Sequence, residues 1–171
     1  KESSTENGEK VRKDVGFQVD QIEHVIRKLV EQPYTRQAQM ITWMPNHDLQ
    51  VYDPPCLQSL WYRIQEDEDG VQWLNSNIRF RSNDAWGASF MNMFGFIQFN
   101  REVIADEISL RNGKVVKLGR MNWQADSYHI YGKDIAQAKA MLFDRLDSMS
   151  LEERIFNFGD DFIREMYDQA E

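Results

Sequence analysis

Apolar and polar residues follow two different periods along this chain, and each change of period marks an expected element. Residues 1–16 are polar and charged, which predicts an N-terminal tail. Asp20–Glu31 carries apolar residues at helical spacing and Pro33 ends the run, so we expect an amphipathic helix. A short strand over Met40–Trp43 and a loop over Met44–Asp48 follow. The apolar stripe of the helix, expected to face the core, is Val19, Ile22, Val25, Ile26, Leu29 and Val30.

A β-hairpin is expected next. Cys56–Ile64 is an extended run that begins after two prolines, and Val71–Arg81 is a second extended run. Gln65–Gly70 between them has the composition of a turn, so the two strands pair through a hairpin tip. Side chains alternate between faces along a strand, which places Arg79 and Arg81 on one face of the return strand.

The second half of the chain predicts a long helix among extended segments. Ser89–Glu107 is apolar on all sides and too long for one strand, which favours a central helix covered on most sides. Asn112–Gly113 is a hairpin-turn signal, and extended segments follow to Tyr131. A helix from Asp134 to about Asp147 and another from Leu151 onward close the chain, the latter with a Ser-x-x-Glu capping box and a break near Gly159.

Composition and charge narrow the class of protein. A chain of 171 residues fits one domain, which we expect over residues 17–171 after the tail. The net charge of −8 argues against binding to nucleic acid or to a membrane surface. We expect no membrane span and no signal peptide, and the single cysteine fits a reducing cytoplasm.

The single cysteine, Cys56, has two interpretations. Most free cysteines are small buried apolar residues, and one cysteine is too few for a metal cage, so we expect no metal. The alternative is a nucleophile, because nearby arginines favour the thiolate that attacks. Arg36, Arg79 and Arg81 could provide such a cluster and bind a phosphate-sized anion.

Six motifs in order give this chain a family resemblance. They are Val19-Asp20-Gln21-Ile22, Pro33-Tyr34-Thr35-Arg36 with the strand ending in Trp43, Pro55-Cys56, Arg81-Ser82-Asn83-Asp84, Asn92 and His129-Ile130-Tyr131. On these residues, over about 17–135, the chain resembles thymidylate synthase and its pyrimidine-hydroxymethylase relatives. The family's N-terminal third has no counterpart in the sequence.

The resemblance implies a fold and a chemistry. It implies an α+β fold with a large mixed or antiparallel sheet and a central buried helix, working as a homodimer with shared active sites. The nucleophile would be Cys56, adding to C6 of a pyrimidine nucleotide monophosphate. C5 would then take a one-carbon unit from 5,10-methylenetetrahydrofolate or a related pterin carrier.

By position, the resemblance also implies a role for each matching residue. Cys56, Arg81 and Asp84 would be catalytic, and Asp84 would also face the pterin. The nucleotide would be bound by Arg81 and Ser82 at the phosphate, Arg36 from the other subunit, Asn92 at the base edge, and His129 with Tyr131 at the ribose.

Three departures leave alternatives open. Leu57 follows the nucleophile where most thymidylate synthases have His, and Gln37 replaces the second cross-subunit arginine. Asn83 replaces the usual Cys or Gly, as in the hydroxymethylase branch. Methylation of dUMP is therefore the leading prediction. Hydroxymethylation of dUMP or dCMP and a catalytically impaired nucleotide-binding dimer module are the alternatives.

Overall fold

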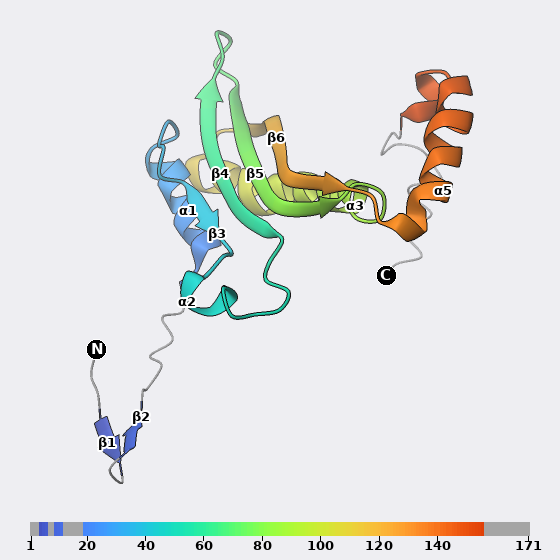
Figure 1. Cartoon of the computed structure of the whole chain (residues 1–171). Helices are drawn as coiled ribbons and strands as arrows, with labels where there is room; N and C mark the ends of the chain where they lie inside the picture. The colour runs from blue at the N-terminus through green and yellow to red at the C-terminus, as the bar shows by residue number, and fades with distance from the viewer. Residues whose placement is uncertain (1–3, 7–8, 12–18, 156–171) are drawn as a thin grey trace, which may run out of the picture.

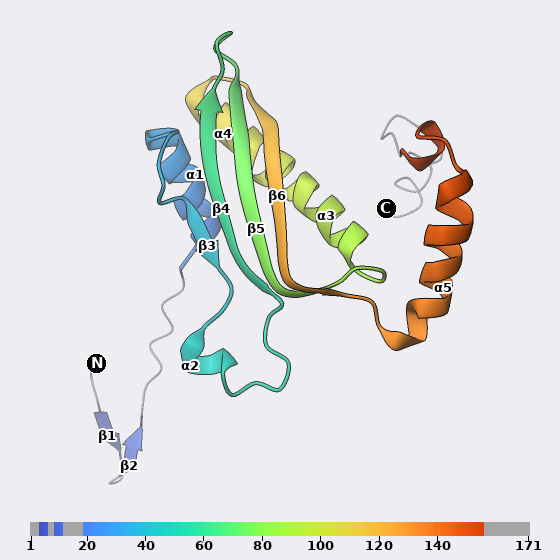
Figure 2. The same ribbon diagram turned by 45° about the horizontal axis from the view of Figure 1, so that its top comes forward.

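A mixed four-stranded sheet forms the centre of the computed structural model, which describes residues 4–6, 9–11 and 19–155. Its strand order is β3-β4-β5-β6, with β3–β4 and β4–β5 antiparallel and β5–β6 parallel. Helix α1 (Gln21–Glu31) and the helical segment between β5 and β6 lie against one face of this sheet and leave the other open, whereas the helical segment after β6 stands apart from the sheet (Figures 1 and 2). The architecture confirms the expected α+β fold. The strands are β3 (Gln39–Ile41), β4 (Leu57–Glu66), β5 (Gln72–Asp84) and β6 (Val116–His129).

The first helix, α1 (Gln21–Glu31), forms where the periodicity predicted it. Asp20 caps it, since its Oδ1 accepts the Glu23 N–H at 2.9 Å. The stripe prediction is correct for the three residues that face the sheet and α4, which are Val25, Ile26 and Leu29. It is wrong for Val19 and Ile22, which are exposed because the packed face of the helix begins one turn later.

The hairpin prediction is confirmed with shifted bounds. Glu66 pairs with Gln72 across the tip, where Gly70 adopts a φ of 78°. The return strand β5 runs on to Asp84, beyond the predicted end, because β6 pairs with it as far as His129. Cys56 lies just before β4 rather than inside it.

The expected loop over Met44–Asp48 contains a one-turn helix, α2 (Pro45–Asp48), so that prediction is wrong. Pro45 has the fixed φ that suits a first helical position. The Asp48 carboxylate accepts the Met44 N–H at 2.5 Å and contacts His47 Nδ1 at 2.9 Å, which closes the turn.

One long helical segment connects β5 to β6. It comprises α3 (Ser89–Gln98), the π-helical η1 (Phe99–Ala105) and α4 (Asp106–Asn112). The predicted helix is therefore present, but not covered on most sides: the exposed fractions of Phe90 and Met91 are 63% and 64%, since only one sheet face packs on it.

The predicted hairpin turn at Asn112–Gly113 is wrong. Gly113 has a φ of 72° and ends α4, with its N–H donating to the Ser109 carbonyl at 3.0 Å. A left-handed glycine is the usual end of a helix, and a helical crossover is what two parallel strands require. The same sequence signal therefore serves a helix end here.

The last described segment is helical. It comprises η2 (Gly132–Asp134), α5 (Ile135–Lys139), η3 (Ala140–Arg145) and η4 (Leu146–Ser148), which confirms the helix expected from Asp134 to about Asp147. The capping box is also present: Ser150 N–H donates to Glu153 Oε2 at 2.7 Å, ahead of the short η5 (Glu152–Arg154). The rest of the final helix, with Gly159, lies outside the described residues.

Two short strands, β1 (Ser4–Glu6) and β2 (Glu9–Val11), pair with each other inside the segment where we expected an irregular tail. The division into a tail and a single domain over 17–171 stays a prediction. No helix in the described part of the chain is long and apolar enough to cross a membrane.

Candidate active site

The ends of three strands bring most of the predicted site residues together. Cys56 stands just before β4, and its carbonyl accepts the Arg81 backbone N–H at 2.8 Å. On the other side of β5, Asp84 pairs with His129 of β6 in the parallel register. One end of the sheet therefore carries the nucleophile candidate, the Arg81–Asp84 motif and the end of β6.

Arg81 fixes the loop that presents Cys56. Its guanidinium donates to the carbonyls of Pro54 at 2.6 Å and Pro55 at 3.2 Å, and pairs with Asp53 at 3.2 Å. These contacts are possible because the period of two places Arg81 opposite the loop. The Cys56 side chain is exposed, so the buried-apolar interpretation is wrong, and the role of its thiol as a nucleophile stays a prediction. Phosphate binding by Arg81 and Ser82 stays a prediction.

Asp84 is an ionised acceptor at the end of β5. Its Oδ1 accepts the N–H groups of Trp86 and Gly87, each at 3.0 Å. The hydrogen bond from Gly87 is the main cause that holds the pKa of the Asp84 carboxyl below its ordinary value; partial desolvation opposes it and the Trp86 hydrogen bond adds to it. A charged carboxylate at this strand end can accept hydrogen bonds from N–H donors of a ligand, and its contact with a pterin stays a prediction.

The ribose-binding candidates lie at the end of β6. The rings of His129 and Tyr131 meet edge to face with centroids 4.9 Å apart, and Tyr131 is exposed. The His129 carbonyl accepts the Ala85 N–H at 2.7 Å, which ties β6 to the turn after β5. Both side chains therefore lie beside the Asp84 end of the site, and their contact with a ribose stays a prediction.

Asn92 enters the site from the first turn of α3. Its Nδ2 donates to Oδ1 of Asn83 on β5 at 3.4 Å, and its backbone N–H donates to the Ala88 carbonyl. Asn83 is buried, whereas Asn92 is half-buried. The short turn between Asp84 and Ser89 is what places the helix start against the strand end. The sequence predicts no contact between Asn83 and Asn92, because the two residues lie in different elements and no local pattern reports that they meet.

Arg36 is the predicted site residue that does not join the cluster within one chain. It is exposed before β3, and its carbonyl accepts Trp61 Nε1 at 3.1 Å. The register pairs Gln39 with Trp61 and Ile41 with Ser59, so Arg36 lies toward the hairpin end of the sheet, away from Cys56. This position agrees with the expectation that Arg36 serves the other subunit and does not test it.

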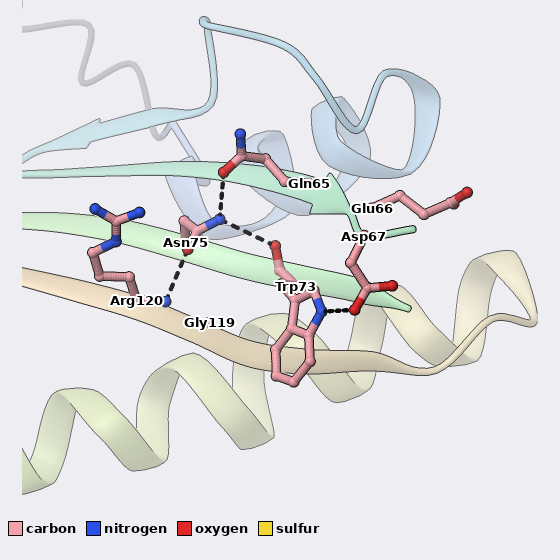
Figure 3. Close-up of a pocket in the computed structure, with 7 residues that line it drawn as sticks. All are labelled: Gln65, Glu66, Asp67, Trp73, Asn75, Gly119 and Arg120. Atoms are coloured by element: carbon pink, nitrogen blue, oxygen red, sulfur yellow. Dashed lines mark hydrogen bonds between the residues drawn. The ribbon is translucent and has the colours of Figure 1, made fainter. Parts of the chain in front are cut away.

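A shallow hollow of about 460 Å³ lies at the opposite end of the sheet from Cys56 (Figure 3). It is lined by Gln65, Glu66, Asp67, Trp73, Asn75, Gly119 and Arg120. Asn75 fills a bulge in β6 there: its Oδ1 accepts the Arg120 N–H at 2.8 Å, and a Cβ on Gly119 would meet that oxygen at 2.7 Å. The hollow is therefore separate from the Cys56 cluster. Among the described residues, no group of three or more His, Cys, Asp or Glu side chains could hold a metal ion.

The comparisons with known proteins agree with this fold and motif order. The family model described as "Thymidylate synthase" matches residues 5–168. The chain therefore belongs to the thymidylate synthase family, and the match extends on both sides of the 17–135 region that carried the resemblance.

Individual relatives and one solved structure show how similar this chain is to known proteins. A protein of Methanococcoides burtonii named "Putative thymidylate synthase" is 34% identical over 116 residues, which cover 68% of this chain and 48% of that protein. One of the same name from Methanocaldococcus jannaschii is 34% identical over 118 residues, covering 66% and 48%. The chain thus spans about half the length of these relatives. The thermostable thymidylate synthase A from Bacillus subtilis shares the fold, with a TM-score of 0.57 and 23% identity over 80% of this chain and 42% of that chain.

Proposed function

We propose that the chain carries the catalytic part of a pyrimidine-nucleotide C5 one-carbon transferase, which converts dUMP to dTMP. The observation that carries this proposal is the exposed Cys56 thiol, held by Arg81 at the same end of the sheet as Asp84, Asn92 and His129. Family membership supports the transferase class.

The proposed chemistry begins at Cys56. Its thiolate sulfur forms a bond to C6 of the uracil ring, and the C5–C6 π electrons move into an enolate at C4–O4. C5 would then attack the one-carbon unit and lose its proton, and the bond from that carbon to the carrier nitrogen would break to leave an exocyclic methylene on C5. Addition of hydride to this methylene would re-form the C5–C6 double bond and expel the Cys56 sulfur. Arg81 holds the loop in place throughout, and Asn92 contacts the base edge. His129 and Tyr131 bind the ribose.

The one-carbon unit comes from 5,10-methylenetetrahydrofolate or a related pterin carrier, which also supplies the hydride when the product is a methyl group. Asp84, with its lowered pKa, would hold the ring N–H donors of that carrier.

Hydroxymethylation is the second candidate. It uses the same Cys56 addition, but water rather than hydride captures the exocyclic methylene. The observation that favours it is the Arg-Ser-Asn-Asp motif, as in the hydroxymethylase branch, with Asn83 in contact with Asn92.

We further propose that two copies share their sites. The open sheet face carries the two indoles Trp61 and Trp73, only partly covered in one chain, and a second copy packed there would protect them. Arg36, exposed beside Trp61, would then reach the phosphate of the partner's nucleotide. The exposed thiol must remain reduced to act, which fits a cytoplasmic protein.

Release of tritium from 5-tritiated dUMP tests the proposal, measured with and without methylenetetrahydrofolate and with Cys56→Ser as the control. Release together with dTMP formation is the expected result. Release with hydroxymethyl-dUMP as the product would favour the second candidate. Binding of dUMP with no release at all would leave a nucleotide-binding dimer module and overturn both enzyme proposals.

A further inference from the structure

The side-chain amide of Asn83 is buried, and its NH₂ group has no hydrogen-bond partner in the described part of the chain. Its side chain is 4% exposed, and its Oδ1 accepts a hydrogen bond from Asn92 Nδ2 at 3.4 Å. Its own Nδ2 is buried and has no hydrogen-bond partner among the described residues. A buried donor without a partner is unfavourable, so its retention beside the proposed base-reading residue calls for a reason.

The two amides can pair in only two ways. In the arrangement of the structure, Asn92 donates through Nδ2 and Asn83 accepts through Oδ1. In the reverse arrangement both amides turn over, and Asn83 Nδ2 donates to Asn92 Oδ1. Turning only one amide brings two donors or two acceptors face to face, which is repulsive. The orientation of Asn92 is therefore coupled to that of Asn83.

The two arrangements leave different groups of Asn92 free for a ligand. In the observed one, Oδ1 of Asn92 keeps both lone pairs and one Nδ2 hydrogen stays available. In the reverse one, both Nδ2 hydrogens stay available and Oδ1 has already accepted a hydrogen bond. Uracil presents N3–H, which needs an acceptor, whereas cytosine presents a bare N3, which needs a donor.

We propose that Asn83 is a positioning residue that sets base specificity by holding the Asn92 amide in the orientation that reads uracil. This inference rests on the proposed function. Asn83 acts through Asn92 and does not touch the base. A site whose polar groups are held in one orientation can reject a mismatched substrate strongly, because the mismatch leaves a buried group unpaired.

Two substitutions separate this role from simple packing. Asn83→Asp keeps the acceptor for Asn92 Nδ2 and removes the unpaired donor, so the uracil orientation is the one it supports. Asn83→Ala removes both and lets Asn92 turn over. Asn46→Ala, at an exposed position of α2, is the matched control. The dissociation constants of dUMP and dCMP are measured by calorimetry for the full chain and each variant.

The expected result is that wild type, Asn83→Asp and Asn46→Ala prefer dUMP. In Asn83→Ala the preference for dUMP should fall about tenfold, mainly because dCMP binds more tightly. A tenfold change corresponds to the net free energy of about one hydrogen bond. The NMR signals of the Asn92 side-chain NH₂ protons give a second measurement in the free protein. They are identified by their loss in Asn92→Asp, and both should change chemical shift in Asn83→Ala. If Asn83→Ala folds poorly, Asn83→Ser, whose hydroxyl both donates and accepts, replaces it.

If Asn83→Ala weakens the binding of dUMP and dCMP equally, the preference is unchanged. This result would overturn the proposed role of Asn83 and leave the proposed function standing. A wild-type chain that binds neither nucleotide would remove the proposed function and the base specificity of Asn83 with it. The two failures are therefore distinguishable.

Discussion

Tyr62 of β4 donates its hydroxyl hydrogen to Oδ1 of Asn100 in the π-helical η1 at 2.9 Å, and both side chains are buried. Asn100 in turn donates through Nδ2 to Ser76 Oγ of β5 at 3.0 Å. Burial raises the pKa of Tyr62 above its ordinary value, so the hydroxyl stays protonated and remains the donor. This chain of contacts joins two strands to the helix that leads away from the candidate active site.

Tyr62→Phe should lower the free energy of unfolding by about 1–3 kcal/mol, because the Asn100 acceptor is left buried without its donor. Urea denaturation measures the change. Tyr34→Phe, at an exposed position, is the matched control and should leave stability unchanged. Equal stability of Tyr62→Phe and wild type would show that the contact contributes nothing net.

The Asp84 carboxylate should make stability depend on pH at the acid end. Its folded-state pKa lies below the ordinary value of 3.8, so its contribution is present above that value and is lost as pH falls through the lower folded pKa. Asp84→Asn cannot titrate, so its stability should fall less steeply than that of wild type below about pH 4. Urea midpoints measured between pH 3 and pH 6 check this, and parallel profiles for the two proteins would contradict it.

Cys56 should be alkylated readily by iodoacetamide, because its thiol is exposed. If the thiol lies against the base, dUMP at ~100 times its dissociation constant should slow labelling about 100-fold. Arg81→Ala should lose this protection, since the loop contacts to Pro54 and Pro55 disappear. Arg79→Ala is the matched control, because Arg79 pairs with Asp126 instead. Labelling that dUMP does not slow would place the base elsewhere.

Arg36→Ala should weaken dUMP binding by about 1.5–3 kcal/mol, the range for a hydrogen bond to a charged group. Arg36→Lys should not restore the affinity, because a lysine cannot bind phosphate with two parallel hydrogen bonds. Mixing Arg36→Ala with Cys56→Ala chains should regain activity in one site of each mixed dimer. If the mixture, at a low dUMP concentration, is no more active than the two separate proteins, the sites are not shared.

Asn92→Asp should shift the nucleotide preference from dUMP toward dCMP, because a carboxylate accepts from the cytosine amino group and repels uracil O4. Calorimetry with both nucleotides measures the shift, and iodoacetamide labelling of Cys56 serves as the control for an intact site. An unchanged preference would mean that Asn92 does not read the base.

The sequence by itself determined the elements whose signals are local. The hairpin tip at Gly70 and the capping box at Ser150 each depend on residues a few positions apart, so the pattern predicted them correctly. The order of the motifs was likewise enough to predict the family, which the match over residues 5–168 confirms. The alternation along β5 also placed Arg81 on the face from which it reaches the loop before Cys56.

Only the tertiary structure decided what depends on distant partners. Asn112–Gly113 suits a hairpin turn and a helix end equally, because both need a positive φ; the parallel pairing of β6 with β5 selects the helix end. The exposure of Val19, Phe90 and Cys56 depends on which faces the sheet covers. The contact between Asn83 and Asn92 likewise exists because a strand end and a helix start meet, and periodicity within either element carries no information about the other.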